Sequence, residues 1–445
     1  MSGFSSKIKI GLLLLVDIVI LYLALWLMLK LRFGPAADLM WQKHFLAFSI
    51  IYPLWILSFY IFGLYDLNLA KNTPSFYWAI LKATILNGLL STTLFYLFPN
   101  FLGVTPKTNL FLNLLFFGIL FSLWRRLYNS LIKSSTLERK VVIIGKNSQT
   151  LELKEKIDSN PQLGYKVISI IDPEKTDEIR LGLQNISPPL HTLVCAVNLN
   201  THPELTKNLY NSLSYFNFES FPDFYEKITG KVPLSQIDEF WFLNNLKERG
   251  KITYEKMKRL LDVAVGLMAG IVTALIFPLV TLAIKLNSPG PVFYKQIRKG
   301  KNGKPFGLYK FRSMKVNERE HEELWREKSP DQITKIGKLL RQTHIDELPQ
   351  SWSILKGDLS LTGPRPEWIK LGEIFEKEIS FYFQRYLVKP GVTGWAQLHF
   401  PASLSVEEAR EKFQYDLYYI KNRSLFLDLK IILKTVNTLL KGGTL

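Results

Sequence analysis

Four long apolar runs fill the first part of the chain. They cover residues 8–29, 45–62, 79–97 and 110–127, and each is about as long as a helix needs to cross a hydrocarbon core of ~30 Å. The first run is too long for the apolar segment of a cleaved signal peptide, and three similar runs follow it. We therefore predict a bundle of four transmembrane helices within residues 1–135.

Charged residues at the ends of these runs indicate their orientation. Lys7 and Lys9 precede the first run, and a basic cluster ends the fourth: Arg125, Arg126, Lys133, Arg139 and Lys140. Because lysine and arginine concentrate on the cytoplasmic side, this pattern places both ends there, although Lys30 and Arg32 weigh against it. Asp17 lies inside the first run, where a charge is costly in lipid, so we expect it to face a neighbouring helix.

The middle of the chain alternates between strand-like and helix-like patterns. KVVIIG at residues 140–145 predicts a buried strand, a polar helix follows over 149–158, and YKVISIID and HTLVCAVNL predict further strands. This rhythm predicts a small Rossmann-like α/β domain over residues 136–245. Gly145 stands alone where a dinucleotide-binding loop needs three glycines, so we favour a packing or regulatory role over nucleotide binding.

A fifth apolar run, residues 263–284, contains Pro278, which removes a helical hydrogen bond. Basic residues flank both ends of this run, so it lacks the charge asymmetry of a spanning helix. A crossing would also place the following segment on the opposite side from the α/β domain. We therefore predict a re-entrant helix over residues 260–286 that bends at Pro278 and returns to the same face. A kinked ordinary span is the alternative.

Two alternating runs after this helix predict a β-hairpin. Residues 292–297 and 305–311 flank a turn that contains Asn302 and Gly303. Aromatic residues alternate there with four cations, which are Lys295, Arg298, Lys310 and Arg312. Such a pattern suits nucleic acid, a nucleotide diphosphate or lipid headgroups. Beside an intramembrane helix we favour the last two.

The segment HIDELPQSWSILKGDLSLTGPRPE carries the strongest chemical signal. Asp346 and Glu347 are adjacent carboxylates just ahead of Pro349, and a Gly-Pro-Arg-Pro loop presents the guanidinium of Arg365. A carboxylate pair among cations suits phosphoryl chemistry, since one carboxylate can attack phosphorus or hold a divalent metal. We expect the pair on an α-helix that Pro349 ends. Solvated acids at a helix end would be the interpretation of a lone Asp-Glu pair.

Composition narrows the classes of function. The formal net charge of +18 implies a negatively charged partner, either nucleic acid or an anionic membrane surface. One cysteine, Cys195, excludes an internal disulfide and gives a thiolate metal site little support. A processive glycosyltransferase would carry a metal-holding Asp-x-Asp triplet, which the sequence lacks. We found no nucleic-acid-binding motif, so we expect no nucleic-acid partner.

From about residue 254 onwards the chain resembles the bacterial sugar transferases, the monotopic polyprenyl-phosphate glycosylphosphotransferases. The resemblance covers about two-fifths of the chain. It rests on ordered blocks that include KRLLDVAVG, SPGPVFYKQIRKGKNGKPF, YKFRSM, HIDELPQ, LKGDLSLTGPRPE, KPGVTGWAQ and YDLYYI. The four apolar runs and the strand-rich middle resemble the large members of that family.

This resemblance implies a fold and a reaction. The fold is an α+β catalytic domain over residues 254–445, with the re-entrant helix and interfacial amphipathic helices. The reaction transfers hexose 1-phosphate from a nucleotide diphosphate sugar, a UDP-sugar, to undecaprenyl phosphate. It begins exopolysaccharide, O-antigen or capsule synthesis at the bacterial inner membrane, with the soluble parts cytoplasmic. A homodimer is compatible with the large non-catalytic half.

The family's functional residues match positions in this sequence. Asp346 matches the nucleophilic aspartate and Glu347 its partner carboxylate, and the pair would share Mg²⁺ with the donor diphosphate. Arg341 and Arg365 match phosphate-binding positions, which we extend to the four hairpin cations. Pro278 matches the break of the re-entrant helix.

Three further features of this region carry open interpretations. Phe277 stands before Pro278 where family members often have a small residue, so the bend is expected to pack differently. KPGVTGWAQ either contacts the donor or forms a shaped turn. The tail over residues 425–440 predicts an amphipathic helix in the headgroup layer, with a core-facing helix as the alternative; its apolar face comprises Leu429, Ile432, Leu433, Val436 and Leu440.

A catalytically inactive membrane scaffold of a polysaccharide assembly complex is the rival interpretation. The intact carboxylate pair and the two matching arginines argue against it.

Overall fold

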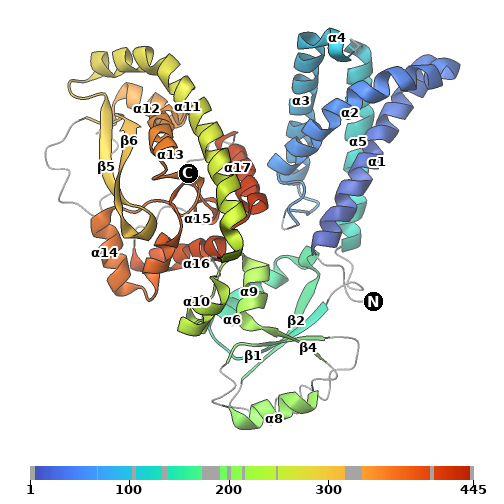
Figure 1. The fold of residues 1–445 in the computed structure, drawn as a ribbon. Coiled ribbons are helices and arrows are strands. Elements are labelled where there is room, and N and C mark those ends of the chain that lie inside the picture. Colours follow the sequence, from blue (N-terminus) through green and yellow to red (C-terminus); the bar gives the residue numbers. More distant parts are fainter. Residues whose placement is uncertain are drawn as a thin grey trace. The chain divides into compact units, whose positions relative to one another are not determined.

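The computed structural model describes residues 6–67, 69–102, 107–132, 139–172, 191–197, 202–212, 216–246, 249–315, 333–400 and 405–440. Lys133 of the predicted basic cluster and the end of HTLVCAVNL lie outside these residues. Internal contacts divide the chain into two compact units, Met1–Thr229 and Gly230–Leu445. Figure 1 shows the ribbon of both.

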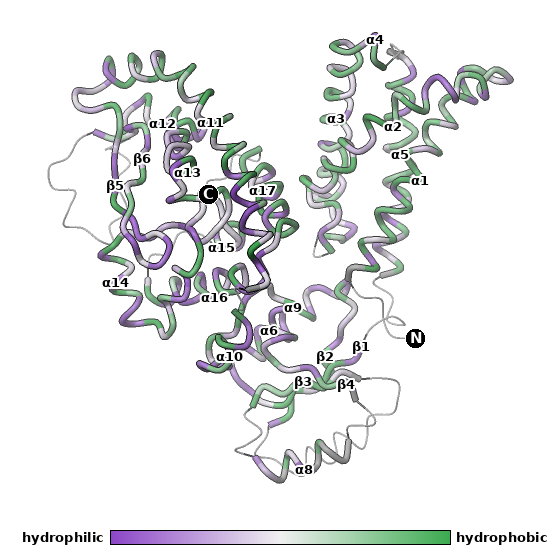
Figure 2. The backbone as a smooth tube through the Cα atoms, viewed as in Figure 1, coloured by the Kyte–Doolittle hydropathy of each residue, from purple (hydrophilic) through white to green (hydrophobic). Residues whose placement is uncertain are grey.

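Helices form at each of the four predicted spans. The first two are separated by a short 3₁₀ turn, and a one-turn helix, α4, follows the third. The α1–α2 stretch, α3 and α5 are long and apolar enough to cross a membrane, and Figure 2 shows them coloured largely hydrophobic. The bounds are α1 Ser6–Phe33, α2 Ala37–Ile61, α3 Pro74–Leu97, α4 Pro99–Leu102 and α5 Lys107–Ile132.

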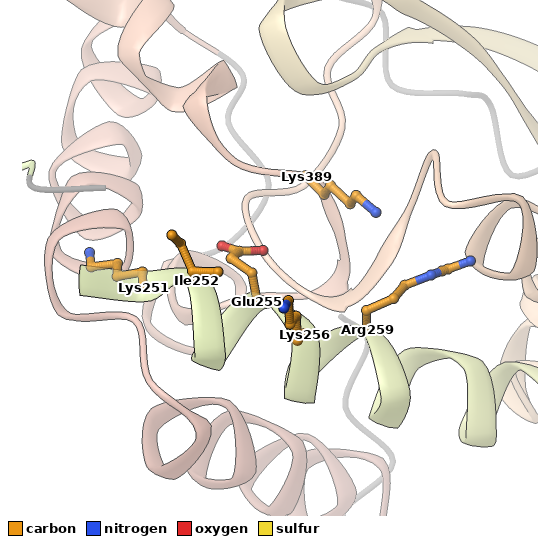
Figure 3. A pocket seen from close by; sticks show the side chains of 6 residues that line it. All are labelled: Lys251, Ile252, Glu255, Lys256, Arg259 and Lys389. Carbon is orange, nitrogen blue, oxygen red and sulfur yellow. The ribbon is translucent and has the colours of Figure 1, made fainter. Parts of the chain in front are cut away.

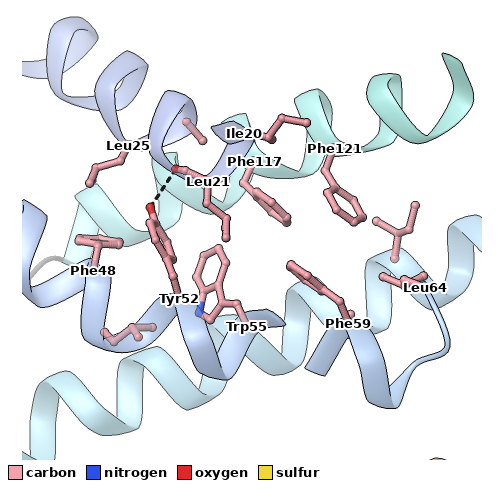
Figure 4. Packing of buried hydrophobic residues seen from close by; sticks show 14 of the residues in the cluster. Ile20, Leu21, Leu25, Phe48, Tyr52, Trp55, Phe59, Leu64, Phe117 and Phe121 are labelled. Atoms are coloured by element: carbon pink, nitrogen blue, oxygen red, sulfur yellow. Dashed lines mark hydrogen bonds between the residues drawn. The ribbon is translucent and has the colours of Figure 1, made fainter. Parts of the chain in front are cut away.

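Aromatic side chains fill the interior of this bundle (Figure 4). The ring of Phe59 on α2 stacks on Phe117 of α5 with centroids 5.4 Å apart, and Trp55 meets Phe117 edge-on at 5.5 Å. The hydroxyl of Tyr52 donates a hydrogen bond to the backbone oxygen of Leu21 over 3.0 Å. These contacts supply the dispersion energy that holds helices together where lipid offers no hydrophobic drive.

One buried ion pair joins the first and last helices of the bundle. Asp17 on α1 and Arg125 on α5 are both fully buried, and their Oδ2 and Nη2 atoms lie 2.5 Å apart. The guanidinium also donates to the backbone oxygen of Leu64 over 3.0 Å and lies 4.7 Å from the ring centre of Phe121. The prediction that Asp17 faces a neighbouring helix is confirmed.

The second part of the first unit is an α/β domain with a parallel sheet, as predicted. The strand order is β2-β1-β3-β4, and all pairs are parallel. Val141 and Ile143 share a core with α6 and α9, whereas Val142 and Ile144 share another with α8. Helices therefore cover both faces of the sheet. The bounds are β1 Arg139–Ile144, α6 Ser148–Asp158, β2 Tyr165–Ile171, β3 His191–Cys195, α8 Pro203–Ser212, β4 Phe216–Ser220 and α9 Phe221–Thr229.

The second unit is α+β and contains two small sheets. The predicted hairpin is confirmed as the antiparallel pair β5–β6, and β7 pairs with β8 in parallel. Helices of very different lengths accompany both sheets, from five residues in α15 to 36 in α11. The bounds are α10 Glu239–Asn245, α11 Ile252–Asn287, β5 Phe293–Lys299, β6 Pro305–Phe311, α12 Lys335–Gln342, the 3₁₀ helix η9 Ile345–Gln350, α13 Ser351–Lys356, β7 Ser360–Thr362, α14 Ile369–Glu378, the 3₁₀ helix η10 Tyr382–Leu387, β8 Gly391–Thr393, α15 Trp395–His399, α16 Val406–Asn422 and α17 Leu425–Leu440.

Helix α11 carries the fifth apolar run. It has 36 residues, which at 1.5 Å per residue makes it about 54 Å long, well beyond a hydrocarbon core of ~30 Å. The helix continues through Pro278, and Figure 1 shows it changing direction before it reaches β5. Large apolar side chains are exposed on both sides of the proline, namely Leu267, Ile271 and Leu275 before it and Leu279, Leu282 and Leu286 after it.

Polar side chains attach the start of α11 to the rest of the second unit. Lys258 donates to the backbone oxygen of Thr362 over 3.0 Å and pairs with Asp428 of α17 over 3.1 Å. Asp262 accepts from the Ser360 hydroxyl over 3.0 Å and from the backbone N–H of Leu361 over 2.9 Å. Helix α11 is therefore fastened to β7 and α17 by buried hydrogen bonds.

Helix α17 matches the predicted tail helix, and its faces are divided. Leu429, Val436 and Leu440 of the predicted apolar face are exposed, whereas Leu433 is buried. Ile431, on another side, is fully buried and shares a core with α15 and α16. The helix therefore packs in the core and still presents apolar side chains outwards.

The buried pair in the bundle makes a prediction about stability. Asp17→Asn leaves the Arg125 charge buried without its partner, which costs about 3–5 kcal/mol. We expect a clear fall in the midpoint of thermal unfolding in detergent. Asp38→Asn is the matched control, because its exposed pair with Lys30 contributes about 1 kcal/mol or less. Equal midpoints for the two variants would contradict the bridging role of Asp17.

Candidate active site

The two adjacent carboxylates lie on η9, between α12 and α13. His344 has a left-handed backbone, with φ of 54°, and turns the chain from α12 into η9. The expectation of an α-helix ended by Pro349 is wrong, since Pro349 lies inside the 3₁₀ turn and the chain continues directly into α13. With three residues per turn, neighbouring side chains diverge by about 120°. Asp346 and Glu347 therefore point to different surroundings.

Glu347 is held by a cation from the hairpin. Its Oε1 accepts a short hydrogen bond from Lys310 Nζ of β6. Burial favours the neutral acid, but the charges of Lys310 and Arg365 outweigh it and hold the pKa of Glu347 below its usual value. Glu347 is therefore held in its ionised form, with one oxygen bonded to Lys310.

Asp346 has the opposite electrostatic setting. Its side chain is only 8% exposed. Burial and the neighbouring Glu347 charge raise the pKa of Asp346, against the opposing charges of Lys310 and Arg341. Among the described residues it receives no hydrogen bond, so its oxygens are available to a ligand. A carboxylate with a raised pKa is more basic, and thus a better nucleophile than an ordinary aspartate.

Both predicted arginines act on the carboxylates. Arg341, near the end of α12, donates from Nε to the Ser313 hydroxyl over 2.9 Å, and its charge favours ionised Asp346. Arg365 favours ionised Glu347. The structure therefore brings two guanidinium groups, from separate segments, to bear on one carboxylate pair.

The four hairpin cations separate into different roles. Lys310 follows Phe306 and Leu308 along the buried face of β6, and Arg298 on β5 is cross-paired with Phe306. Arg298 donates to the Pro366 backbone oxygen over 3.2 Å. Burial, and to a smaller extent the Arg365 charge, lowers the pKa of Arg298, although the Glu367 charge opposes this shift. Its guanidinium is therefore joined to the arginine loop.

Lys295 and Arg312 are placed differently. Tyr294 is paired with Lys310, so these two residues share a face of the hairpin. Lys295 is the next residue after Tyr294 and therefore lies on the opposite face, where it is exposed. Its Nζ is 5.7 Å from the ring centre of Tyr309. Arg312 is buried and donates to the backbone oxygens of Pro289 and Ser288 over 2.6 and 2.7 Å. These bonds fasten the segment that leaves α11.

The Gly-Pro-Arg-Pro loop rests on the KPGVTGWAQ segment. Gly363 donates to the Thr393 backbone oxygen and Gly391 to that of Pro364, both over 2.9 Å. A Cβ atom on Gly363 would lie 2.5 Å from the Lys389 backbone oxygen, and one on Gly391 would lie 2.1 Å from the Gly363 nitrogen. Two backbones meet here without intervening side chains, so KPGVTGWAQ is a shaped support for the arginine loop.

A buried ionic cluster below this loop escaped prediction from the sequence. Arg385 of η10 pairs with Glu367 over 3.0 Å and with Asp416 of α16 over 2.7 Å, and Lys412 pairs with Glu367 over 3.4 Å. Arg385 also donates to the backbone oxygen of Arg365 over 3.1 Å. The cluster therefore fixes the backbone that presents Arg365. Its partners are distant in sequence, and the only signal was Glu367 directly after the loop.

Comparison with known proteins identifies the second unit. Residues 253–442 match the bacterial sugar transferase family. Over 186 residues the chain is 41% identical to an uncharacterized sugar transferase of Bacillus subtilis, covering 41% of this chain and 87% of the relative. The chain belongs to the bacterial sugar transferase family. The resemblance seen in the sequence is thereby confirmed.

Two other relatives of this sugar transferase have named activities. It is 39% identical over 217 residues to the UDP-N-acetylgalactosamine-undecaprenyl-phosphate N-acetylgalactosaminephosphotransferase of Aeromonas hydrophila, covering 49% of this chain and 51% of the relative. It is 40% identical over 181 residues to the UDP-glucose:undecaprenyl-phosphate glucose-1-phosphate transferase of Klebsiella pneumoniae, covering 40% and 39%. The matches therefore span about half or less of these two relatives.

The carboxylate pair of this sugar transferase fits magnesium. Mg²⁺ binds proteins through one or two carboxylates and takes its other ligands from waters and substrate phosphates. Asp346 has oxygens that carry no hydrogen bond among the described residues, and Glu347 follows it on η9. Carboxylates are the donor type that Mg²⁺ takes, and these two residues would hold the ion.

Phe277, which directly precedes Pro278 in α11, packs in a stack of aromatic rings. The Phe277 ring lies 5.7 Å from Phe293 at an interplanar angle of 13°, and Phe293 lies 5.4 Å from Phe311 at 17°. Phe311 directly follows Lys310 on β6. The departure at Phe277 therefore connects α11 to the strand that carries the lysine bound to Glu347.

The buried ionic cluster predicts a pH dependence of stability. Burial opposes ionisation, but Lys412, Arg385 and Arg298 lower the pKa of Glu367 from 4.5 to about 2. A folded-state pKa below the unfolded value stabilises the fold above pH 4.5, and this contribution disappears as the pH falls towards 2. The difference corresponds to roughly 3 kcal/mol. Unfolding of Glu367→Gln should therefore depend less on pH between about 5 and 3 than that of wild type.

Two comparisons sharpen this measurement. Glu373→Gln removes an exposed carboxylate from α14 and should leave the wild-type profile unchanged. Burial raises the pKa of Asp416 in spite of Arg385, so its titration acts in the opposite direction. The Glu367 charge is a smaller cause of that rise, so Glu367→Gln weakens this opposing contribution as well. A Glu367→Gln profile parallel to wild type would show that the cluster does not stabilise the loop through this charge.

Proposed function

We propose that this protein transfers hexose 1-phosphate from a UDP-sugar to undecaprenyl phosphate. The observation that carries the proposal is the unbonded, buried carboxylate of Asp346, beside a second carboxylate held by Lys310 and within the fields of two arginines. The named activities of the Aeromonas and Klebsiella relatives support the donor and the acceptor.

The proposed reaction has two displacements at one phosphorus atom. An Asp346 oxygen attacks the sugar-bearing phosphorus of the donor, and the bond to the bridging oxygen breaks, which releases UMP. A phosphate oxygen of undecaprenyl phosphate then attacks the same phosphorus and displaces Asp346. The products are undecaprenyl diphosphate-sugar and the regenerated carboxylate. No proton must leave Asp346 for the first attack, since an ionised carboxylate is already a nucleophile.

The surrounding cations make this attack feasible. A carboxylate and a diphosphate repel each other, so positive charge must be fixed around the phosphate oxygens. Arg341 and Arg365 supply it in the proposed assignment, and Arg298 extends it along the arginine loop. When bound, Mg²⁺ would neutralise donor phosphate charge, with Asp346 and Glu347 as its protein ligands. Lys295 and Arg312 stay assigned to phosphate binding only as a prediction, and the contacts of Arg312 favour a structural role.

The exposed apolar side chains on both sides of Pro278 support insertion of α11 into the membrane, and its change of direction supports the proposed re-entrant path over a straight span. A helix that enters and leaves on one face keeps the active site at the membrane surface, where a soluble donor and a lipid phosphate can meet. The apolar bundle and the basic ends of its helices support an inner-membrane location with the soluble parts in the cytoplasm. The reaction would then begin a surface polysaccharide on the cytoplasmic side.

The activity predicts UMP release that requires both the acceptor and Asp346. Purified full-length protein with Mg²⁺ and undecaprenyl phosphate should release UMP from at least one member of a panel of UDP-sugars. Asp346→Asn removes the nucleophile and should lower the rate at least about 10³-fold, by analogy with the loss of other covalent nucleophiles. UMP measured by coupled assay and lipid product measured by mass spectrometry identify the sugar together.

Asp358→Asn, a substitution of the same type at an acid paired with Lys356 after α13, is the matched control and should keep most of the activity. Acceptor-independent release of sugar phosphate would point to a hydrolase. No release with any donor, by protein that folds normally, would favour the inactive scaffold.

The Glu347–Lys310 pair predicts a shift in the pH profile. Lys310 lowers the pKa of Glu347, so Lys310→Gln should raise that pKa and protonate Glu347 at a higher pH. The acidic limb of kcat/KM for UMP release should therefore move to higher pH. Lys304→Gln, an exposed lysine at the turn of the same hairpin, should leave the limb in place. A slower Lys310→Gln enzyme with an unmoved limb would contradict the electrostatic role.

A further inference from the structure

A second concave site lies at the start of α11, apart from the carboxylate pair. It has a volume of about 530 Å³ and is lined by Lys251, Ile252, Glu255, Lys256, Arg259 and Lys389. Figure 3 shows Lys389 reaching over the first turns of α11 from its own loop. Four cations therefore surround one hollow that contains a single carboxylate.

Some of these groups already have partners. Lys251 donates to the backbone oxygens of Ile420 and Lys421 over 3.0 and 2.9 Å. Glu255 pairs with Arg423 over 3.2 Å. Glu255, the one carboxylate of the site, is therefore already paired with Arg423, a cation that does not line the hollow.

The remaining cations converge without an ion pair to a described residue, although the charges of Asp262 and Glu255 act on Lys389 and partly offset that of Arg259. Arg259 donates to the backbone oxygens of Ile354 and Leu355, each over 2.6 Å, and these are neutral acceptors. Lys256 and Lys389 form no hydrogen bond or ion pair with the described residues. A Cβ atom on Gly357 would lie 3.5 Å from Lys389 Nζ and 3.6 Å from Arg259 Nη2, so these two cations meet at that glycine.

This convergence is unfavourable unless an anion joins it. Lys389 is half-buried, and burial together with the Arg259 charge lowers its pKa. Two like charges that are partly shielded from water repel each other more strongly than they would in bulk solvent. A bound anion would reverse this repulsion. Lysine and arginine on a concave surface are the groups that proteins use to bind phosphate.

The position of the hollow on α11 indicates where its ligand comes from. Exposed large apolar side chains of α11 lie on both sides of Arg259: Ile252 and Met257 precede it, and Leu260 and Leu261 directly follow it. If α11 enters the membrane there, the cations lie at the depth of lipid phosphates. Arg259 binds the C-terminal end of α13, whereas the carboxylate pair precedes the N-terminal end of α13. The hollow is therefore separated from Asp346 by the length of that helix.

We infer that Lys256, Arg259 and Lys389 form a phosphate-binding site distinct from the carboxylate pair, which takes the phosphate group of an anionic phospholipid. A soluble phosphate compound such as the released nucleotide offers the same chemistry. The inference requires α11 to lie at the membrane surface, but it does not depend on the transfer reaction.

The test measures binding rather than turnover. Full-length protein is placed in nanodiscs of phosphatidylcholine with a trace of fluorescent phosphatidylglycerol or fluorescent phosphatidylcholine, and energy transfer from protein tryptophans reports enrichment. Wild type should enrich phosphatidylglycerol several-fold over phosphatidylcholine. The double variant Lys256→Gln/Lys389→Gln should lose at least about fivefold of this preference. Unchanged unfolding in phosphatidylcholine alone would show that the variant folds.

The control removes the same charge elsewhere. Lys370→Gln/Lys377→Gln neutralises two exposed lysines of α14 and should keep the lipid preference. A second arm titrates pyrophosphate and UMP into phosphatidylcholine discs. If wild type binds pyrophosphate or UMP saturably, shows no lipid preference, and only the Lys256→Gln/Lys389→Gln variant loses this binding, the site would be assigned to a soluble phosphate. Equal lipid and soluble-anion binding by both double variants would overturn the inference. Each outcome is independent of whether UMP release is observed.

Discussion

The attachment of α11 to the second unit is the constraint on which the catalytic geometry depends. The part of α11 around Pro278 packs through apolar side chains, since Val280 and Ile284 share a buried cluster with Phe311. At its start the helix is held by polar contacts, through buried bonds of Lys258 and Asp262 to Thr362, Asp428 and the β7 backbone. Strand β7 leads directly into the Gly-Pro-Arg-Pro loop. Helix α11 and the arginine loop are therefore both attached to the same short strand, β7.

Electrostatics then divides the two carboxylates between two tasks. Both lie on one 3₁₀ turn, yet their pKa values move in opposite directions because only Glu347 is bonded to Lys310. Glu347 is bonded to the hairpin through one oxygen, whereas Asp346 keeps oxygens without a hydrogen bond among the described residues. Deeper in the fold, Arg385 holds the loop of Arg365 in position through its pair with Glu367 and its bond to the Arg365 backbone oxygen.

Sequence reasoning succeeded where a local pattern has one physical meaning. A run of about twenty apolar residues predicts a membrane helix, and alternation around Asn302-Gly303 predicts a hairpin, because both depend on periodicity alone. The intramembrane Asp17 had to find a partner, although the sequence did not name Arg125.

It failed where several structures share one pattern. Cation type alone also does not reveal that Arg312 donates to backbone oxygens, so its assignment to phosphate stays a prediction. The sequence of a short polar segment does not distinguish an α-helix from a 3₁₀ helix, so the prediction that Asp346 lies on an α-helix was wrong. The Arg385 cluster joins partners that only the tertiary fold brings together.

The contact between Gly363 and Gly391 limits how this active site can diversify. Because main-chain atoms of two segments fill the space that any Cβ would need, neither position can accept a larger residue without moving the arginine loop. Side chains can vary more freely on β5 and β6, whose positions alternate between two faces of the hairpin. The candidate site thus combines a loop fixed by backbone contacts with a hairpin that tolerates substitution.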